Sequence, residues 1–344
     1  MTEQKILLVL GGTSASLDVV RTAQEMGVYV IVTDNQENGV AKDLADESAT
    51  VSTTDMDGLL RLIKEKNIDG VFCGPSEFNI QNTMKICKLA NLPFYVTKEQ
   101  WDICSNKESF KQLCRDNDVP TVLEYDVDLN SAHELSADDI KYPVIIKPVD
   151  GCSSKGISVC YSGDELKQAY DEALEFSESE RVIVEKYIEN GGTVTSVRYI
   201  ANDGKLYLSL TGDTYIVDPY HRTALISAVT IFPSKHTDMY VKDIDERVQA
   251  MFETIGIKNG VLFMQSLTEG NHLYFHEMGL RLSGGLTYQI TETANGVNDL
   301  KMMIRYALGG PMAYKEEIEL IDPNLNGKIA ASLCIPLKVG RIKS

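Results

Sequence analysis

The sequence has no hydrophobic run that approaches the roughly 18 apolar residues a membrane span needs. Its start, MTEQKILLVL, also lacks the positively charged segment and the cleavage site of a secretory signal. Hydrophobic residues make up 43% of the 344 residues and charged residues 24%, which is typical of a globular protein with two or three domains. We therefore expect a cytoplasmic protein without a membrane partner.

Cysteines in metal-binding or disulfide patterns are missing too. The seven cysteines are scattered, odd in number and contain no Cys-x-x-Cys pair, which favours reduced thiols over a zinc site or a disulfide framework. An excess of positive charge is also lacking: the formal net charge is −17, whereas a nucleic-acid surface needs clustered lysine and arginine. The composition therefore argues against a nucleic-acid partner, but a small anion can still bind where a few lysines gather.

The first hundred residues alternate between apolar segments of strand length and amphipathic segments of helix length. This pattern predicts a parallel sheet with helices on both faces, as in a Rossmann-like domain. The predicted strands are Lys5–Leu10, Val28–Thr33, Gly70–Cys73 and Phe94–Val96, and the predicted helices are Leu17–Met26, Leu59–Lys66 and Asn79–Ala90. The Gly11-Gly12 turn lacks the third glycine of a dinucleotide fingerprint, so a Rossmann-type oxidoreductase is a weak alternative.

Residues beyond Pro143 follow a different pattern, in which a small strand–helix unit precedes long antiparallel strands. Apolar residues recur at helical spacing between Leu166 and Leu174, and Ser162 and Glu165 have the spacing of a capping box. The predicted hairpins join Ser196–Ile200 to Leu206–Leu210 and Val261–Leu267 to His272–Glu277, and a helix is expected over Asp238–Ile255. This part of the chain is therefore expected to have an α+β architecture.

Polar residues at several places in this second region have the chemistry of a polyphosphate site. Lys147 ends an apolar strand and precedes the Gly151–Gly156 loop, which offers backbone N–H groups and hydroxyls. Glu185 ends another strand, and Gln265 and Glu277 stand twelve residues apart across a hairpin. Each residue also has an ordinary structural explanation, because half the residues of an antiparallel sheet commonly face water. Only their order and spacing distinguish the two interpretations.

That order resembles the ATP-grasp superfamily, in its carbamoyl-phosphate-synthetase-like, carboxylate–amine ligase branch. The resemblance runs from about residue 5 to the C-terminus, and its strongest pieces are SNK at 105–107, YPVIIKP at 142–148, the Gly151–Gly156 loop, VEKYI at 184–188 and FHEMGLR at 275–281. It implies a Rossmann-like domain over 1–100 and a two-lobed ATP-grasp domain over 101–312, with a mobile lid at about 122–190. Residues 313–344 are expected to begin a C-terminal subdomain that is truncated here.

The resemblance implies an ATP-dependent ligase that activates a carboxylate as an acyl phosphate for attack by an amine or similar nucleophile. Both substrates would be small molecules, the metal would be Mg²⁺ with Mn²⁺ as an alternative, and a homodimer is common among relatives. Such phosphoryl transfer depends on charge neutralisation and positioning. The implied site residues are Lys107 and Lys147 at the α- and β-phosphates, Ser153, Ser154 and Gly156 in the loop over the β- and γ-phosphates, Glu185 at the adenine amino group, the backbone of Lys186, Tyr187 and Ile188 at the ring edge, Gln265 and Glu277 at the metal, and Arg281 at the transferring phosphoryl group.

Two departures from the family pattern leave a second function open. Gly279 stands where the pattern Glu-x-Asn-x-Arg has asparagine, and the glutamate that would contact the ribose has no clear counterpart near 191–193. The alternative is a catalytically impaired protein that binds ATP or ADP. Arg198 and Arg222 are candidate anchors for a substrate carboxylate because a guanidinium matches a carboxylate bidentately, although surface ion pairs would explain them equally well.

Overall fold

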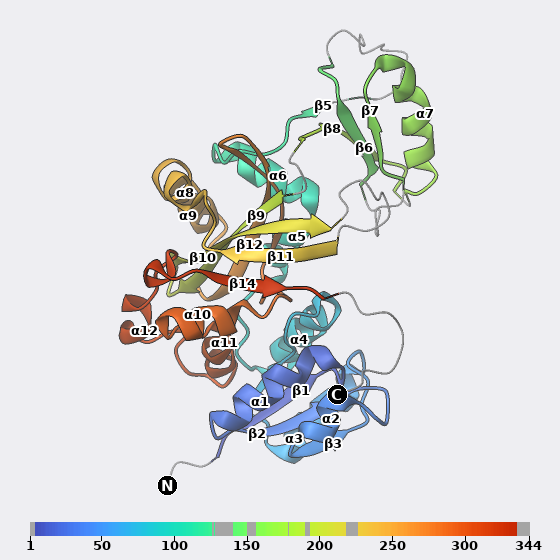
Figure 1. Ribbon diagram of the computed structural model, residues 1–344. Coiled ribbons are helices and arrows are strands. Elements are labelled where there is room, and N and C mark those ends of the chain that lie inside the picture. Colours follow the sequence, from blue (N-terminus) through green and yellow to red (C-terminus); the bar gives the residue numbers. More distant parts are fainter. Residues whose placement is uncertain are drawn as a thin grey trace.

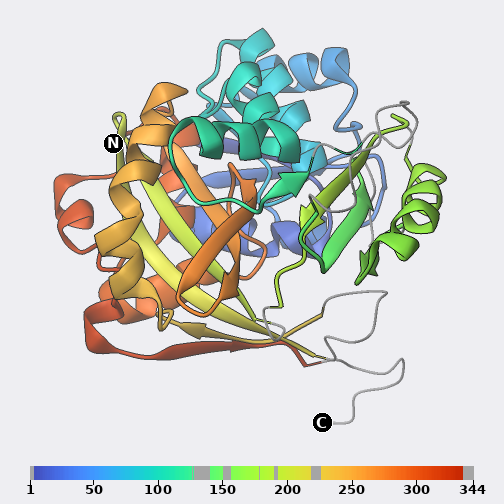
Figure 2. The same ribbon diagram turned by 90° about the horizontal axis from the view of Figure 1, so that it is seen from above.

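Three β-sheets organise the part of the chain described by the computed structural model, which comprises residues 4–125, 127, 140–149, 156–177, 179–189, 193–217 and 226–335. An N-terminal domain and a small lobe lie at opposite ends of the molecule, and the central sheet lies between them (Figure 1). Seen from above, the small lobe stands beside the central sheet (Figure 2). Among the described residues, no helix combines the length and apolar character needed to cross a bilayer.

The N-terminal domain is the predicted parallel sheet with helices on both faces. Its strands are β1 (Ile6–Leu10), β2 (Tyr29–Thr33), β3 (Glu47–Ala49) and β4 (Gly70–Phe72), in the order β3-β2-β1-β4. Its helical elements are η1 (Ser14–Ser16), α1 (Leu17–Glu25), α2 (Val40–Leu44), α3 (Met56–Lys66) and α4 (Glu77–Ala90). The strand predicted at Phe94–Val96 is wrong, since this segment has no sheet partner, whereas β3 has too little apolar character to be recognised from sequence.

The small lobe is a four-stranded sheet covered on one face by a helix. The strands β5 (Glu124–Tyr125), β6 (Val144–Pro148), β7 (Ser158–Cys160) and β8 (Val182–Lys186) have the order β5-β8-β6-β7, and the helix is α7 (Gly163–Leu174). The predicted apolar stripe of α7 packs against Val144, Ile146 and Val184. The predicted capping box forms only in part, because Ser162 makes no side-chain cap and Glu165 accepts from the N–H of Tyr161 instead.

Two short helices, α5 (Lys98–Ser105) and α6 (Lys107–Asp116), lead from the N-terminal domain to the small lobe. Each begins at a side-chain cap. Thr97 and Gln100 form a reciprocal capping box on α5, and Asn106 accepts a hydrogen bond from the N–H of Ser109 at the start of α6. The capped break between the helices places Lys107 at the first position of α6.

The central sheet contains both predicted hairpins. Its strands are β9 (Thr193–Asn202), β10 (Lys205–Val217), β11 (Ile226–Phe232), β12 (Gly260–Glu269), β13 (His272–Gly279) and β14 (Ala330–Leu333), in the order β13-β12-β9-β10-β11-β14. One face packs on α8 (Thr237–Asp243) and α9 (Asp245–Thr254), which replace the single helix predicted there. On the other face lie α10 (Thr287–Asn295) and α11 (Asp299–Ala307), followed by α12 (Lys315–Glu319) and η3 (Leu325–Gly327).

A shared hydrophobic core joins the N-terminal domain to the central sheet. Leu7 and Val9 of β1 belong to the same cluster as Ile200 of β9 and Val261 of β12, with α11 between the two sheets. Gly70 marks a close approach, because β4 passes directly beside the carbonyl group of Ala307 at the end of α11. Burial of apolar surface therefore holds these two bodies in one arrangement.

We expect Gly70→Ala to destabilise the protein. A Cβ atom at this position would lie 2.2 Å from the carbonyl oxygen of Ala307, and this neighbour is backbone that has no rotamer to adopt. Overpacking of this kind costs about 1–3 kcal/mol, measurable by urea unfolding. The matched control is Gly284→Ala, where no atom lies within 4 Å of the added Cβ, and an unfolding free energy equal for Gly70→Ala and wild type would contradict the prediction.

Candidate active site

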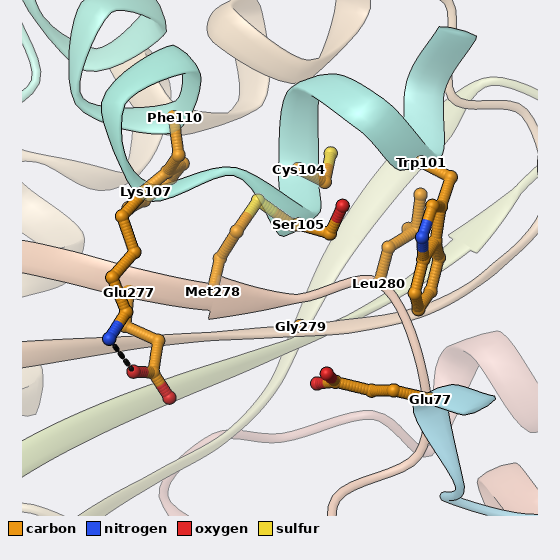
Figure 3. Close-up of a pocket in the computed structure, with 10 residues that line it drawn as sticks. All are labelled: Glu77, Trp101, Cys104, Ser105, Lys107, Phe110, Glu277, Met278, Gly279 and Leu280. Atoms are coloured by element: carbon orange, nitrogen blue, oxygen red, sulfur yellow. Dashed lines mark ion pairs between the residues drawn. The ribbon is translucent and has the colours of Figure 1, made fainter. Parts of the chain in front are cut away.

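A cavity of about 220 Å³ lies where the N-terminal domain, the α5–α6 junction and β13 meet. Figure 3 shows Lys107 and Glu277 pointing toward one another at one end of it, with Glu77 directed inward from the N-terminal domain. Burial raises the pKa of the Cys104 thiol in its wall to about 12, so this thiol stays protonated. The lining residues are Glu77, Trp101, Cys104, Ser105, Lys107, Phe110, Glu277, Met278, Gly279 and Leu280.

Lys107 and Glu277 form an ion pair at one end of the cavity, with 3.6 Å between Nζ and Oε2. Their side chains are 49% and 41% exposed, so the pair is open to solvent and contributes little to stability. An exposed pair of this kind can be exchanged for interactions with a ligand. The sequence prediction that both residues belong to one site is consistent with this contact.

Gln265 and Glu277 are direct neighbours on β12 and β13, as their spacing predicted. The ladder then shifts, because Ser266 pairs with Phe275 and leaves His276 as the extra residue of a β-bulge. Burial, followed by the charge of Lys147, lowers the pKa of His276 to about 4, so the bulge adds no positive charge near neutral pH.

The paired oxygens of Gln265 and Glu277 suit Mg²⁺. This ion is commonly held by one or two carboxylates together with substrate phosphates and water. No group of three or more His, Cys, Asp or Glu side chains that could hold a metal occurs in the described ranges. The donor set therefore fits a metal that arrives with a nucleotide rather than one caged by protein ligands alone.

Lys147 and Glu185 also come together, within a buried charge network on the inner face of the small lobe. Glu185 accepts from Lys147 through Oε2 at 2.5 Å and from Lys111 through Oε1 at 2.5 Å. Lys111, which is only 1% exposed, also donates to Glu124 at 2.7 Å. Since Glu124 and Glu185 are directly opposed on β5 and β8, the ammonium group of Lys111 offsets the repulsion between their charges.

The network keeps Glu185 ionised. Burial alone would raise the pKa of this carboxyl group, but the attraction of Lys147 and then of Lys111 outweighs burial and holds the pKa below its usual range. Both oxygens are thus in use without a nucleotide. A carboxylate can accept more than one hydrogen bond per oxygen, so the predicted contact with adenine remains a prediction.

Among the described residues, two of the three backbone N–H groups at 186–188 have a backbone partner. The N–H of Lys186 donates to the carbonyl of Leu123, and that of Tyr187 donates to the carbonyl of Pro143. Within the described part of the chain, the N–H of Ile188 has no such partner. If residues 186–188 bind the edge of the adenine ring as predicted, the N–H of Ile188 and the backbone carbonyl groups would form the hydrogen bonds.

Part of the predicted phosphate loop lies outside the described residues, including Ser153 and Ser154, and so does the candidate anchor Arg222. Gly156, the last residue of the loop, is described and has φ +68°, a left-handed conformation that favours glycine. An added Cβ would also approach Phe176 to 2.9 Å. Glycine is therefore required at this end of the loop on two separate grounds.

Arg281 links the central sheet to the N-terminal domain. Its Nε and Nη2 donate to one oxygen of Glu77, at 3.1 and 2.9 Å, and its guanidinium lies over the ring of Phe263 at 5.1 Å from the centroid. The stacking and the ion pair together orient the group beside the cavity. Glu77 is the first residue of α4, so the carboxyl end of the parallel sheet takes part in the site, as expected for open α/β sheets.

Packing against a neighbouring strand explains why glycine stands at position 279, which the sequence alone could not explain. It pairs with Phe263 across β12 and β13, and an added Cβ would lie 2.5 Å from two ring atoms of Phe263. The aromatic ring therefore fills the place where the asparagine of the family pattern would stand, and the same ring supports Arg281.

The sequence analysis missed Lys111 and Phe263. Lys111 lies four residues after Lys107, the spacing at which two side chains share one face of a helix, and this signal was available. No comparable sequence signal pointed to Phe263, because an aromatic residue in a strand usually belongs to the hydrophobic core. Its role depends on the register between β12 and β13.

Comparison with known proteins places this geometry in context. A family model described as "Carbamoyl-phosphate synthase L chain, ATP binding domain" matches residues 106–315. The formate-dependent phosphoribosylglycinamide formyltransferase of Sulfurisphaera tokodaii is 27% identical over 330 residues, which cover 93% of this chain and 79% of that protein.

Two solved structures show that the fold is shared. The phosphoribosylglycinamide synthetase from Anaerococcus prevotii has a TM-score of 0.73 at 20% identity, covering 90% of this chain and 76% of that one. The biotin carboxylase domain of the Hydrogenobacter thermophilus 2-oxoglutarate carboxylase, a dimer in complex with MgADP, ADP and bicarbonate, has a TM-score of 0.72 at 23% identity, covering 92% and 72%. The predicted fold class, a Rossmann-like parallel sheet followed by a two-lobed α+β region, is confirmed.

We expect Gly279→Asn to destabilise the protein by about 1–3 kcal/mol, because the new side chain would overlap the ring of Phe263. Phe263→Leu removes the two ring atoms involved, so the double variant should be more stable than the sum of the single effects by about 1 kcal/mol or more. Denaturant unfolding of all four forms measures this coupling. Strict additivity would show that the two residues do not share this space.

We expect Glu185→Gln to lower the unfolding free energy by on the order of 3 kcal/mol at pH 7, because it removes the charge that Lys111 and Lys147 surround. The folded-state pKa of Glu185 is depressed, so its stabilisation is complete above the unfolded value of about 4.3 and is lost as the pH falls through the folded value. The difference between wild type and variant should therefore shrink as the pH falls below the unfolded-state pKa. Glu319→Gln, at an exposed pair with Lys315, is the control and should show no such trend.

Proposed function

Because the chain belongs to the ATP-grasp superfamily, in the family of the carbamoyl-phosphate synthase L chain ATP-binding domain, we propose that its ligase reaction takes place where α6, β13 and the small lobe meet. It is an ATP-dependent enzyme of the ligase type, which activates a carboxylate as an acyl phosphate. The relatives with this fold are named as formyltransferase, synthetase and carboxylase. ATP and Mg²⁺ accordingly match the MgADP complex of one of these neighbours.

The arrangement of positive charge around one small region is the observation that carries this proposal. Lys107 faces Glu277, Lys147 faces Glu185, and the charges of both lysines act on the half-buried ring of His276. Arg281 approaches from the far side of the cavity. Three cations at one place in a chain of net charge −17 suit the phosphates of ATP.

The residue roles proposed here are those that the family resemblance implies. Lys107 and Lys147 neutralise the α- and β-phosphates, exchanging their carboxylate partners for phosphate oxygens when the nucleotide binds. The N–H of Ile188 and the carboxylate of Glu185 receive the adenine ring, and the 151–156 loop covers the terminal phosphates. Gln265 and Glu277 would hold Mg²⁺, or Mn²⁺ as an alternative, which neutralises charge on the phosphates when bound.

The reaction proceeds in two transfers. A carboxylate oxygen attacks the γ-phosphorus, the bond to the ADP oxygen breaks, and Arg281 stabilises the charge on the transferring phosphoryl group. A nucleophile such as an amine then attacks the acyl carbon, the bond to phosphate breaks, and the amine loses one proton. The small-molecule substrates enter from the side of Glu77 and the N-terminal domain.

The remaining expectations stay predictions. A homodimer accords with the dimeric carboxylase domain among the structural neighbours. A cytoplasmic location accords with the six free cysteines and the absence of a disulfide in the described ranges. No observation favours the catalytically impaired alternative, since packing against Phe263 accounts for Gly279.

We expect Lys147→Ala to abolish detectable ADP formation, with a loss of at least about 100-fold, because one fixed charge at the phosphates is removed. The first measurement is calorimetric titration with a non-hydrolysable ATP analogue, with and without Mg²⁺, and binding should be Mg²⁺-dependent and weakened in the variant. Lys167→Ala is the matched control, since Lys167 forms only an exposed pair with Asp171 on α7.

Either of two results would overturn this assignment. Unchanged turnover in Lys147→Ala would show that Lys147 does not belong to the active site. Tight analogue binding by the wild type, without ADP release on any carboxylate tested, would instead establish the nucleotide-binding alternative.

A further inference from the structure

His276 lies on β13 directly before Glu277, and it is the extra residue of the bulge between β12 and β13. Phe275 and Met278, which flank this pair, both belong to the same buried core cluster. Residues three apart in a regular strand face opposite sides, so the bulge turns His276 and Glu277 together toward the other face. His276 therefore shares the face of the proposed metal ligand.

The strand is held from both sides at this bulge. Phe275 pairs with Ser266 of β12, and its N–H donates to the carbonyl of Pro120 at 2.9 Å. The carbonyl of Phe275 accepts from the Oγ1 of Thr121 at 2.7 Å. The bulge is thus built into the strand by contacts on each edge. Bulges are frequent beside active sites, where they redirect a side chain.

The charged groups proposed for the nucleotide all act on this ring. They are, in order of their effect on the pKa of His276, Lys147, Glu185 and Lys107. Lys147 is on β6, Glu185 on β8 and Lys107 at the start of α6. The ring therefore lies where the small lobe, α6 and the central sheet meet, which is the place proposed for the nucleotide.

The two nitrogens of the His276 ring differ in access. Nδ1 is enclosed and forms no hydrogen bond within the described part of the chain, whereas Nε2 is on the open side of this half-buried residue. The backbone carbonyl of Tyr274 favours a proton on the ring. A proton on the enclosed Nδ1 leaves the lone pair on Nε2, because a neutral imidazole has one donor and one acceptor. The open nitrogen is therefore an acceptor.

His236 has an incomplete hydrogen bond as well, but away from the site. It is 6% exposed, and its Nε2 is enclosed without a partner in the described ranges. The charged groups that act on it are Asp213 and Lys235, and neither belongs to the proposed nucleotide site. An enclosed and unpartnered ring nitrogen is therefore no evidence for a ligand by itself. His276 differs in its open Nε2 and in its place beside Glu277.

We propose that His276 binds the sugar of the nucleotide, with Nε2 accepting a hydrogen bond from a ribose hydroxyl group. The proposal rests on the ligase function above and adds a residue to its nucleotide site. Phosphate oxygens are acceptors and offer nothing to a nitrogen lone pair. The donors of ATP are its ribose hydroxyl groups and its adenine amino group, and Glu185 is already proposed for the amino group. The hydroxyl groups are thus the donors left for His276.

The test compares the non-hydrolysable ATP analogue with its 2′-deoxy and 3′-deoxy forms. Each is titrated by calorimetry into the full chain with Mg²⁺ at pH 8, where a histidine of ordinary pKa is neutral. At least one deoxy form should bind the wild type about fivefold more weakly than the ribose form, because one hydrogen bond is lost. The position of that deoxygenation identifies the hydroxyl group.

Variants separate the hydrogen bond from packing. His276→Leu should bind the ribose form about fivefold more weakly, bind the discriminated deoxy form as the wild type does, and show no fall in Tm. His276→Gln should keep part of the discrimination, because its side-chain oxygen is also an acceptor. His236→Leu is the matched control and should discriminate as the wild type does. Inorganic tripolyphosphate, which has no sugar, should bind the wild type and His276→Leu equally.

Several results would overturn this inference alone. They are equal binding of the ribose form and both deoxy forms by the wild type, full discrimination retained in His276→Leu, and weaker binding of tripolyphosphate by that variant. The last result would assign His276 to the phosphates. Failure of the wild type to bind either the ATP analogue or tripolyphosphate would overturn the proposed function itself.

Discussion

The buried ammonium group of Lys111 is the interaction on which the site depends. It lies between Glu124 and Glu185, which face one another on adjacent strands of the small lobe and would repel without it. One turn earlier on the same helix, Lys107 faces Glu277 on the central sheet. A single helix thus connects the charges of both sheets, and it begins at a side-chain cap on Asn106.

The other residues discussed for the site lie along one face of the central sheet. Phe263 is at its centre, between Gly279 on one side and Arg198 on the other. Its ring excludes a side chain at Gly279 and supports the guanidinium of Arg281, so a departure from the family pattern becomes a consequence of packing.

The sequence correctly predicted those helices and strands whose residue patterns lie within a short stretch of the chain. Both hairpins have their expected partners, because loop length and alternation determine register over a short distance. The pairing of Gln265 with Glu277 is part of the same signal. The sequence predictions were wrong where contacts between distant segments determine the secondary structure. The strand β3 was not predicted, because it forms only through its pairing with β2. The helix expected at 238–255 is interrupted at Ile244, because Asp245 begins α9 and accepts a hydrogen bond from Tyr199.

Residue types and their order along the chain by themselves determined the fold class, the family and the set of charged residues proposed to serve the nucleotide. The tertiary structure alone decided which of those charges meet. Lys111 and Glu77 contact partners 74 and 204 residues away in sequence, Glu185 and Arg281. A charge inside a folded protein acts through its distance to other charges and its access to water, and both quantities exist only once distant segments have packed together.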